Sequence, residues 1–153
     1  MTAIQSKVTL RQVTADNVRG ICELAVKEEQ NTYVVANAIA IAEACFSEED
    51  WCRAIYADQK PVGLAVVKVQ PDNDRYFLWR LMIDARHQNL NYGHRAMELL
   101  IEHVKHKLNA AEFLTSVVPG DHCPQGFYES LGFQLTGEWH NGEAIMRLSF
   151  DEK

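Results

Sequence analysis

The stretch FLWRLMIDARHQNLNYGHRAM, residues 77–97, decides the fold of this chain. Residues 77–83 are apolar at both parities apart from Arg80, which predicts a strand covered on both faces near the middle of a sheet. One parity holds Phe77, Trp79, Leu81 and Ile83, and the other holds Leu78 and Met82. The apolar spacing then becomes helical, through Tyr92, Ala96, Leu99, Leu100, His103, Val104 and Leu108. The turn at 88–93 thus lies at a helix start, where free N–H groups and the helix dipole attract an anion.

Length and composition indicate one globular domain spanning residues 1–153. The net charge of −6 argues against a general nucleic-acid binder and is compatible with a cationic small substrate. No apolar run approaches the roughly 20 residues of a membrane helix, and residues 1–7 lack the pattern of a signal peptide. We therefore expect a cytoplasmic protein with no membrane partner. The four cysteines form no CxxC pair and are expected to be free thiols: Cys22, Cys45, Cys52 and Cys123.

The segments before the central stretch predict a strand, two helices and a hairpin. We expect a strand at 7–13 and then a helix from Thr14 to about Glu29, with an apolar stripe at Val18, Ile21, Cys22 and Ala25. A second amphipathic helix is indicated by Val35, Ala38, Ile39, Ala42, Cys45 and Phe46. Strands at 51–57 and 62–69, joined by a short polar turn, make a hairpin.

The segments after the long helix predict a strand at 112–118, a short helix and a second hairpin. Pro124 fits the first turn of that helix and Gly132 its C-terminal cap. The hairpin pairs 133–138 with 144–150 around Asn141-Gly142. The predicted order of elements is therefore β-α-α-β-β-β-α-β-α-β-β.

This order, together with two motifs, resembles the GNAT acetyltransferase superfamily over essentially the whole chain. The loop from Gln88 to Gly93 is similar to that family's acyl-CoA loop, with Asn91 where the first glycine stands. FYESLGF, residues 127–133, resembles its FYxxLGF signature. Residues 51–57, 61–63 and 78–83 are also similar to a bacterial spermine/spermidine acetyltransferase subgroup. The resemblance implies an α/β (α+β) fold with a mixed, mostly antiparallel central sheet of about seven strands and about four helices.

The resemblance implies an acetyl-CoA-dependent N-acetyltransferase acting on a primary amine of a small cationic acceptor, such as the polyamines spermidine and spermine. The amine would attack the thioester directly in a ternary complex. One rival changes the acceptor to a protein amine or a drug. A rival from another class is a non-catalytic acyl-CoA-binding sensor, and the residue that motivates it is Asn91. Oligomeric state is left open, a homodimer being one option.

The resemblance also assigns the cofactor site. The pyrophosphate would bind backbone N–H groups of the helix-start turn, and the pantetheine arm would lie along the central strand like an added strand. Asp121 stands where many members carry an asparagine that bonds this arm; its alternative role is to cap the helix at Pro124. The predicted cofactor-binding residues are Leu81, Met82, Ile83, Gln88, Asn89, Leu90, Asn91, Tyr92, Gly93, His94 and Asp121.

Tyr128 corresponds to the family's tyrosine that protonates the departing sulfur. A phenol is protonated at neutral pH and can donate to a thiolate. Its alternative role is packing beside Phe127 and Phe133.

The acceptor side is indicated by charged residues. Arg80, on a buried strand, either pairs with a carboxylate such as Glu28 or Glu29 or lines the acceptor site. Glu28 and Glu29 either attract the acceptor's ammonium or form a solvated helix end. Three histidines near the expected cofactor or acceptor entrance are candidate proton shuttles, with none chosen as the base: His87, His94 and His122. No metal site is expected, because His103 and His106 have no third ligand.

Overall fold

The computed structural model describes residues 6–26, 36–47, 50–70, 75–120 and 123–150. Along the chain the elements are β1 (Val8–Gln12), α1 (Val18–Cys22), α2 (Asn37–Ala44), β2 (Trp51–Ala57), β3 (Lys60–Gln70), β4 (Arg75–Ile83), the 3₁₀ turn η3 (Ala85–His87), α3 (Tyr92–Glu102), the π-helical turn η4 (His103–Lys107), β5 (Glu112–Val117), α4 (Gln125–Ser130), β6 (Gln134–His140) and β7 (Glu143–Ser149). The predicted order of strands and α-helices is confirmed.

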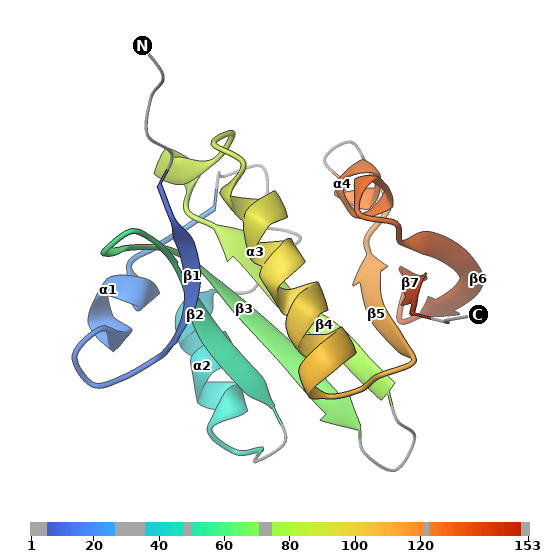
Figure 1. The fold of residues 1–153 in the computed structure, drawn as a ribbon, viewed down its shortest axis with the longest axis horizontal. Coiled ribbons are helices and arrows are strands. Elements are labelled where there is room, and N and C mark those ends of the chain that lie inside the picture. The colour runs from blue at the N-terminus through green and yellow to red at the C-terminus, as the bar shows by residue number, and fades with distance from the viewer. Residues whose placement is uncertain (1–5, 27–35, 48–49, 71–74, 121–122, 151–153) are drawn as a thin grey trace.

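The strands form one seven-stranded sheet in the order β1-β2-β3-β4-β5-β7-β6 (Figure 1). Neighbouring strands are antiparallel except for β4 and β5, which are parallel. The parallel pair arises because the chain crosses over through α3 between those two strands, as parallel neighbours require. The predicted mixed, mostly antiparallel sheet is therefore confirmed.

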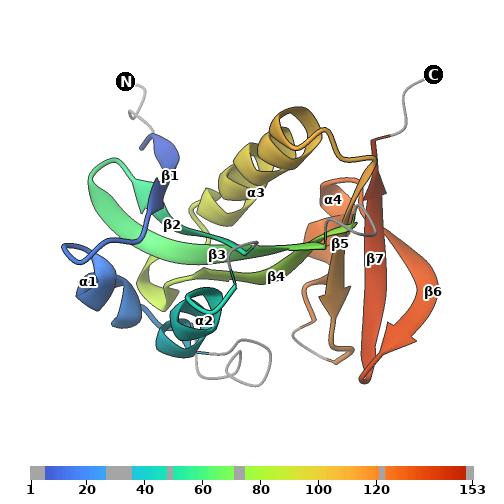
Figure 2. The same cartoon turned by 90° about the horizontal axis from the view of Figure 1, so that it is seen from below.

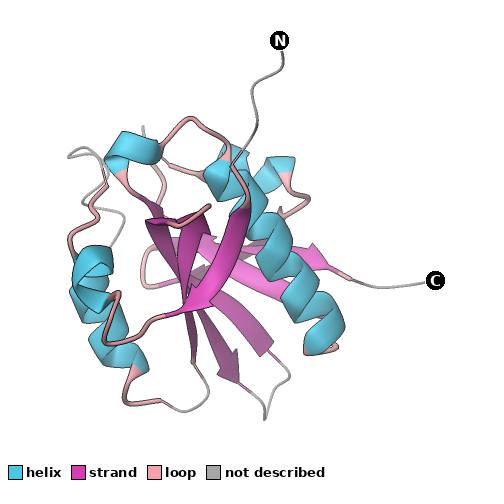
Figure 3. Cartoon of the chain, turned by 60° about the vertical axis from the view of Figure 1, so that its left-hand side comes forward, coloured by secondary structure: helices cyan, strands magenta, loops and turns pink. Residues whose placement is uncertain are grey.

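Helices cover both faces of the sheet, and each face has its own core. In Figure 2, α3 lies on one face and α1 and α2 lie on the other; Figure 3 shows the sheet between these helical layers. The larger core joins α3 and α4 to the sheet and is centred on Met97, Leu100, Phe113 and Phe133. The smaller core joins α1 and α2 to it through Ile21, Ala40, Leu64 and Met82. This two-sided burial explains the apolar residues at both parities of β4.

A β-bulge interrupts β4 at Trp79. Arg80 lies opposite Val66, whereas Leu78 lies opposite the adjacent Val67, so Trp79 is an extra residue on β4. The faces consequently exchange at this point: Leu78 packs in the larger core before the bulge, and Leu81 packs against that core after it. The prediction that residues 77, 79, 81 and 83 share one face is therefore wrong, because a bulge breaks the two-residue period.

β4 and β5 separate towards their carboxyl ends. Within the described residues their ladder has one register pair, Phe77 with Leu114, and Figure 1 shows the two strands diverging beyond it. On the other edge of β4 the Asp84 N–H donates to the Val62 carbonyl at 2.8 Å. Since residues of an antiparallel ladder alternate in the direction of their backbone groups, the N–H groups of Leu81 and Ile83 point into the opening.

The first helix is shorter than predicted. It spans Val18–Cys22 rather than Thr14 to about Glu29, and Cys22 is exposed. The backbone of Ala25 explains the early end: its N–H donates to Asp84 Oδ1 at 3.0 Å, and its carbonyl accepts from the Ala85 N–H at 2.8 Å. These bonds to the end of β4 replace the helical ones. Residues 27–35 lie outside the described part of the chain.

The second helix buries a different face from the one predicted. Its buried residues are Asn37 and Ala40, while Ile39 is 52% exposed and Phe46, just after the helix, is 92% exposed. The Asn37 side chain donates to the Ile21 carbonyl at 2.9 Å, which draws this polar residue inside. The apolar spacing is a poor guide here because both faces of the segment are rich in alanine and isoleucine.

The predicted turn residues of the last hairpin and of the end of α4 are confirmed. Gly132 ends α4 with φ +103°, and Asn141-Gly142 forms the β6–β7 turn with φ of 52° and 80°. All four cysteines are free thiols. None of the helices in the described ranges is long and apolar enough to cross a membrane.

Candidate active site

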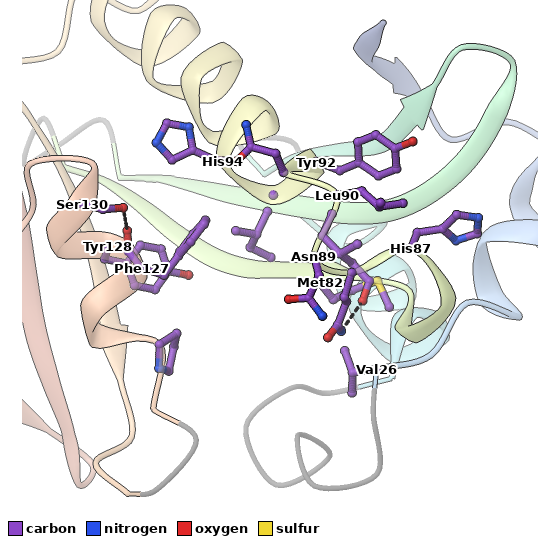
Figure 4. A pocket seen from close by; sticks show the side chains of 16 residues that line it. Val26, Met82, His87, Asn89, Leu90, Tyr92, His94, Phe127, Tyr128 and Ser130 are labelled. Atoms are coloured by element: carbon purple, nitrogen blue, oxygen red, sulfur yellow. Dashed lines mark hydrogen bonds between the residues drawn. The ribbon is translucent and has the colours of Figure 1, made fainter. Parts of the chain in front are cut away.

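The opening beside β4 leads into a cavity of about 850 Å³. Its walls come from the carboxyl end of β4, the turn at 88–91, the start of α3, α4 and Val26. Figure 4 shows Phe127 and Tyr128 of α4 on one side of the cavity, with Asn89 and Leu90 of the turn across from them. Segments far apart in the sequence thus meet where two parallel strands diverge, which is where α/β sheets bind ligands.

Asp84 fixes the turn that forms one wall. Its buried carboxylate accepts hydrogen bonds from the backbone N–H of Ala25 at 3.0 Å and from the N–H and Nε of Arg86 at 3.2 and 2.9 Å. Burial alone would raise the pKa of Asp84, but these bonds, together with one from His87, lower it below its ordinary value. Asp84 therefore joins β4, η3 and the segment after α1 in one anchored corner.

Gln88 and Asn91 complete the turn. The Gln88 Nε2 donates to the Ile83 carbonyl at 2.8 Å, which ties the turn back to the free edge of β4. Asn91 has φ 70°, and Asn89 has φ 65°, so both occupy the left-handed region. Asn91 therefore adopts the conformation that a glycine would supply at this position, since asparagine is the side chain that tolerates it best.

Asn91→Gly is expected to leave the free energy of unfolding within about 0.5 kcal/mol of that of the wild type, and Asn91→Ala to lower it by about 1 kcal/mol. The reason is the φ of 70°, which glycine adopts freely and alanine does not. Urea unfolding of the three proteins measures the difference. An alanine variant as stable as the glycine variant would contradict this account of Asn91.

Two sets of backbone donors border the cavity. The first N–H groups of α3, at Tyr92, Gly93 and His94, have no partner within the helix, and the N-cap Asn91 side chain does not supply one. The second set is the edge of β4 at Leu81 and Ile83. The first set suits a phosphate group, and the second suits an extended arm with amide groups. A Cβ at Gly93 would approach Ile83 and Phe127 at 3.6 Å, so its absence leaves room beside the first set.

Tyr128 stands at the inner wall of this cavity. Its ring packs edge-on against Phe127 and Phe133, with centroids 5.2 and 5.6 Å apart. Burial raises the pKa of Tyr128 to about 12, and a side-chain hydrogen bond with Thr115 partly offsets this. The hydroxyl is therefore a proton donor throughout the neutral range. The packing that was the alternative role for Tyr128 is present, and it also fixes the ring at the cavity.

A smaller cavity of about 120 Å³ lies between β4, β5 and α4. It shares Leu81, Pro124 and Tyr128 with the larger cavity, and on its other side it shares Arg80 and Glu143 with an outer groove of about 350 Å³. The three cavities thus adjoin one another along the gap between β4 and β5.

Arg80 lines this gap and forms a structural ion pair, but with a residue that the sequence did not indicate. Its Nη2 lies 3.8 Å from Glu43 Oε1 of α2, while its Nε is buried and has no hydrogen-bond partner among the described residues. Burial lowers the pKa of Arg80, and the charges of Glu43 and Glu143 oppose that shift. The suggested partners, Glu28 and Glu29, lie outside the described residues.

The structure brings nearly all of the predicted cofactor residues together. Asp121 lies outside the described residues, as does His122. His87 and His94 also line the cavity; His87 Nδ1 lies 3.1 Å from Asp84 Oδ2, and His94 Nδ1 lies 3.9 Å from Glu98 Oε2. The predicted residues on the cavity are Leu81, Met82, Ile83, Gln88, Asn89, Leu90, Asn91, Tyr92, Gly93, His94 and Tyr128.

Sequence reasoning missed Asp84 and Glu143 and left the two histidines of η4 without partners. An aspartate directly after a buried strand is a usable signal for Asp84, because such residues cap the turn that follows. Nothing in the sequence singles out Glu143. His103 stacks on Trp51 with ring centroids 4.2 Å apart, and His106 pairs with Glu102 at 3.3 Å. No group of three metal-ligating side chains occurs among the residues that the structure describes.

The model of the acetyltransferase (GNAT) family matches residues 18–133. The chain belongs to the GNAT family. It is therefore an acetyltransferase by family, and the loop and FYxxLGF resemblances led to the correct assignment. The matched region includes the helix-start turn and Tyr128.

Individual relatives agree with the family and differ in their acceptors. The chain is 26% identical to a spermine/spermidine N(1)-acetyltransferase of Bacillus subtilis over 91% of this chain and 96% of the relative. Among solved structures it is similar to the PaiA N-acetyltransferase of Thermoplasma acidophilum in complex with coenzyme A (TM-score 0.73, 15% identity, 94% of this chain and 99% of the other). It is also similar to the ribosomal-protein-S18-alanine N-acetyltransferase of Escherichia coli (TM-score 0.72, 17% identity, 96% of each chain).

Proposed function

We propose that this GNAT protein transfers an acetyl group from acetyl-CoA to a primary amine of a small cationic acceptor, a polyamine such as spermidine or spermine. The observation that carries the proposal is the meeting of three features on one cavity: the N-terminal N–H groups of α3, the free edge of β4 and the Tyr128 hydroxyl. The polyamine acceptor is supported by the Bacillus subtilis relative and by the net charge of −6, which favours cationic ligands.

The residues of the chain fit the parts of such a co-substrate. The start of α3 would hold its phosphates through backbone N–H groups and the helix dipole. The N–H groups of Leu81 and Ile83 would bind the extended arm, and the one nearest the thioester would polarise its carbonyl. Acetyl-CoA supplies an activated acetyl thioester, and Tyr128 would donate a proton to the sulfur that leaves.

The proposal is tested first by binding. Acetyl-CoA is expected to raise the melting temperature of the wild type, because a ligand at about 100 times its Kd stabilises the folded state by about 2.7 kcal/mol. The matched control is Gly93→Asp, whose Cβ meets only ordinary contacts. An acidic residue in the first turn suits the helix but repels a phosphate, so this variant should fold and show no shift.

Turnover then identifies the acceptor. Thiol release from acetyl-CoA is measured with spermidine, spermine and a lysine peptide, and we expect both polyamines to be faster than the peptide. Faster turnover of the peptide would support a protein acceptor. A melting-temperature shift without turnover of any amine would contradict the enzyme proposal and support an acyl-CoA-binding sensor.

A further inference from the structure

We propose that Glu143 binds the reacting ammonium of the acceptor and takes its proton. This inference rests on the proposed function and adds a residue that lies outside the region matched by the family model. It starts from the small cavity between β4, β5 and α4, which both Tyr128 and Glu143 line. Among the described residues that line this cavity, Glu143 is the one carboxyl group.

Glu143 is held in place by the sheet. It is the first residue of β7, next to Ala144, which is paired with Val117 of β5. Ser116 Oγ donates to its Oε1 at 2.6 Å, a short bond of the kind that a carboxylate accepts. Glu143 forms no ion pair among the described residues. The nearby arginines have other partners: Arg80 pairs with Glu43 and Arg147 with Glu112. The second oxygen of Glu143 is thus left for a ligand.

The surroundings of Glu143 favour a neutral amine after proton transfer. The titratable groups that line the small cavity with Glu143 are Arg80 of β4 and Tyr128 of α4. Those that line the outer groove with it are Lys68, Arg75, Arg80, Glu138 and His140, its register partner on β6. The guanidinium of Arg80 acts on Glu143 across the cavity, and its Nε is buried without a partner among the described residues. Glu143 attracts the ammonium and the charge of Arg80 repels it, and this repulsion ends once the amine has passed its proton to Glu143.

The position of Glu143 also suits the direction of attack. The larger cavity, proposed for the co-substrate, reaches Tyr128 from one side, and the outer groove reaches Glu143 from the other. An acceptor that enters by the groove meets Glu143 before it meets Tyr128. The two substrates would then approach through opposite ends of the gap.

Protons and electrons balance in the transfer. Glu143 takes one proton from the ammonium and later releases it to solvent, and the freed lone pair of nitrogen forms the bond to the acyl carbon. The C–S bond breaks, and sulfur leaves with the electron pair and takes the proton that Tyr128 donates. The nitrogen, now part of an amide, loses its second proton, which restores the Tyr128 hydroxyl.

The test compares Glu143→Gln with Glu102→Gln, a matched change of an exposed glutamate on α3 that lines none of the three cavities. At about pH 7 we expect Glu143→Gln to lower kcat/KM for spermidine about 100-fold. The loss should shrink towards about pH 9.5, because free amine becomes more abundant as pH approaches an amine pKa of about 10.4. Glu102→Gln should stay within about twofold of the wild type.

Binding gives a second readout. Calorimetric titration of spermidine into the CoA-loaded protein should show a Kd about tenfold weaker for Glu143→Gln, the loss of one charge-assisted hydrogen bond. A melting-temperature shift with acetyl-CoA shows that the variant is folded. If Glu143→Gln shows no shift, Glu143→Asp is used in its place. For Glu143→Asp we expect a partial loss of kcat/KM and the same pH profile as the wild type.

The outcomes separate the two proposals. If the wild type acetylates spermidine and Glu143→Gln behaves like Glu102→Gln, the role of Glu143 is overturned and the proposed function stands. A loss that is equal at every pH indicates a structural effect and also overturns it. If the wild type acetylates no amine, the proposed function fails, and the acceptor role of Glu143 fails with it.

Discussion

Replacing Tyr128 with phenylalanine is expected to lower kcat by about 10²–10⁴-fold, the contribution typical of a positioned general acid. The ring contacts with Phe127 and Phe133 remain in the variant, because they do not involve the hydroxyl. The change removes the proton donor on the cavity together with the side-chain hydrogen bond to Thr115. The melting-temperature shift with acetyl-CoA should therefore persist while turnover falls.

Tyr76→Phe is the matched control for this change. Tyr76 is also buried, on β4, but it lines none of the three cavities described above. Steady-state thiol release should show wild-type kcat for Tyr76→Phe and the large loss for Tyr128→Phe. If both variants keep wild-type turnover, Tyr128 only packs, and another group protonates the sulfur.

The environment of Tyr128 also predicts the basic side of the pH profile. Burial raises the pKa of Tyr128 to about 12, so its hydroxyl keeps its proton up to that pH in the folded protein. The general acid should therefore not limit turnover between about pH 7 and pH 10.

Asp84→Asn is expected to lower the free energy of unfolding by about 2–4 kcal/mol at pH 7. The side-chain oxygen of the new asparagine can still accept from the Ala25 N–H, but its NH₂ group would then face the N–H and Nε of Arg86. All of these groups are hydrogen-bond donors, so both bonds from Arg86 would be lost. Urea unfolding measures the loss. The exposed Asp58, which accepts from the Lys7 N–H at 3.0 Å, supplies the control: Asp58→Asn should cost less than about 0.5 kcal/mol.

The pH dependence of this loss has a definite sign. The pKa of Asp84 is lowered in the folded protein, because hydrogen bonds from Arg86, Ala25 and His87 outweigh the effect of burial. The ordinary pKa of this carboxyl group, which applies in the unfolded chain, is 3.8. Because the pKa is lower in the folded protein, the ionised carboxylate stabilises the fold at pH values above 3.8, and this stabilisation is lost as the pH falls through the pKa of the folded protein. The gap between wild type and Asp84→Asn should be constant above about pH 5 and narrow below 3.8; a gap that widens in acid would contradict this account.

Local patterns predicted much of the fold. The helical period from Tyr92, the Asn141-Gly142 turn and the cap at Gly132 are each set by neighbours along the chain, and each is observed. The predicted end of α1 and the predicted buried face of α2 were wrong. They depend on Ala25 bonding to Asp84 and on Asn37 bonding to Ile21, contacts between segments distant in sequence.

By itself, the sequence determined the order of elements, the family and the line of residues from the central strand through the turn to the long helix, because these follow from periodicity, turn residues and short motifs. Only the tertiary structure decided where β4 is bulged, that β4 and β5 separate beyond Phe77 and Leu114, and that Glu143 meets Tyr128 and Arg80 around one cavity. The physical reason is that register, bulges and cavities arise from how whole strands and helices pack on one another, and no single stretch of residues encodes that packing.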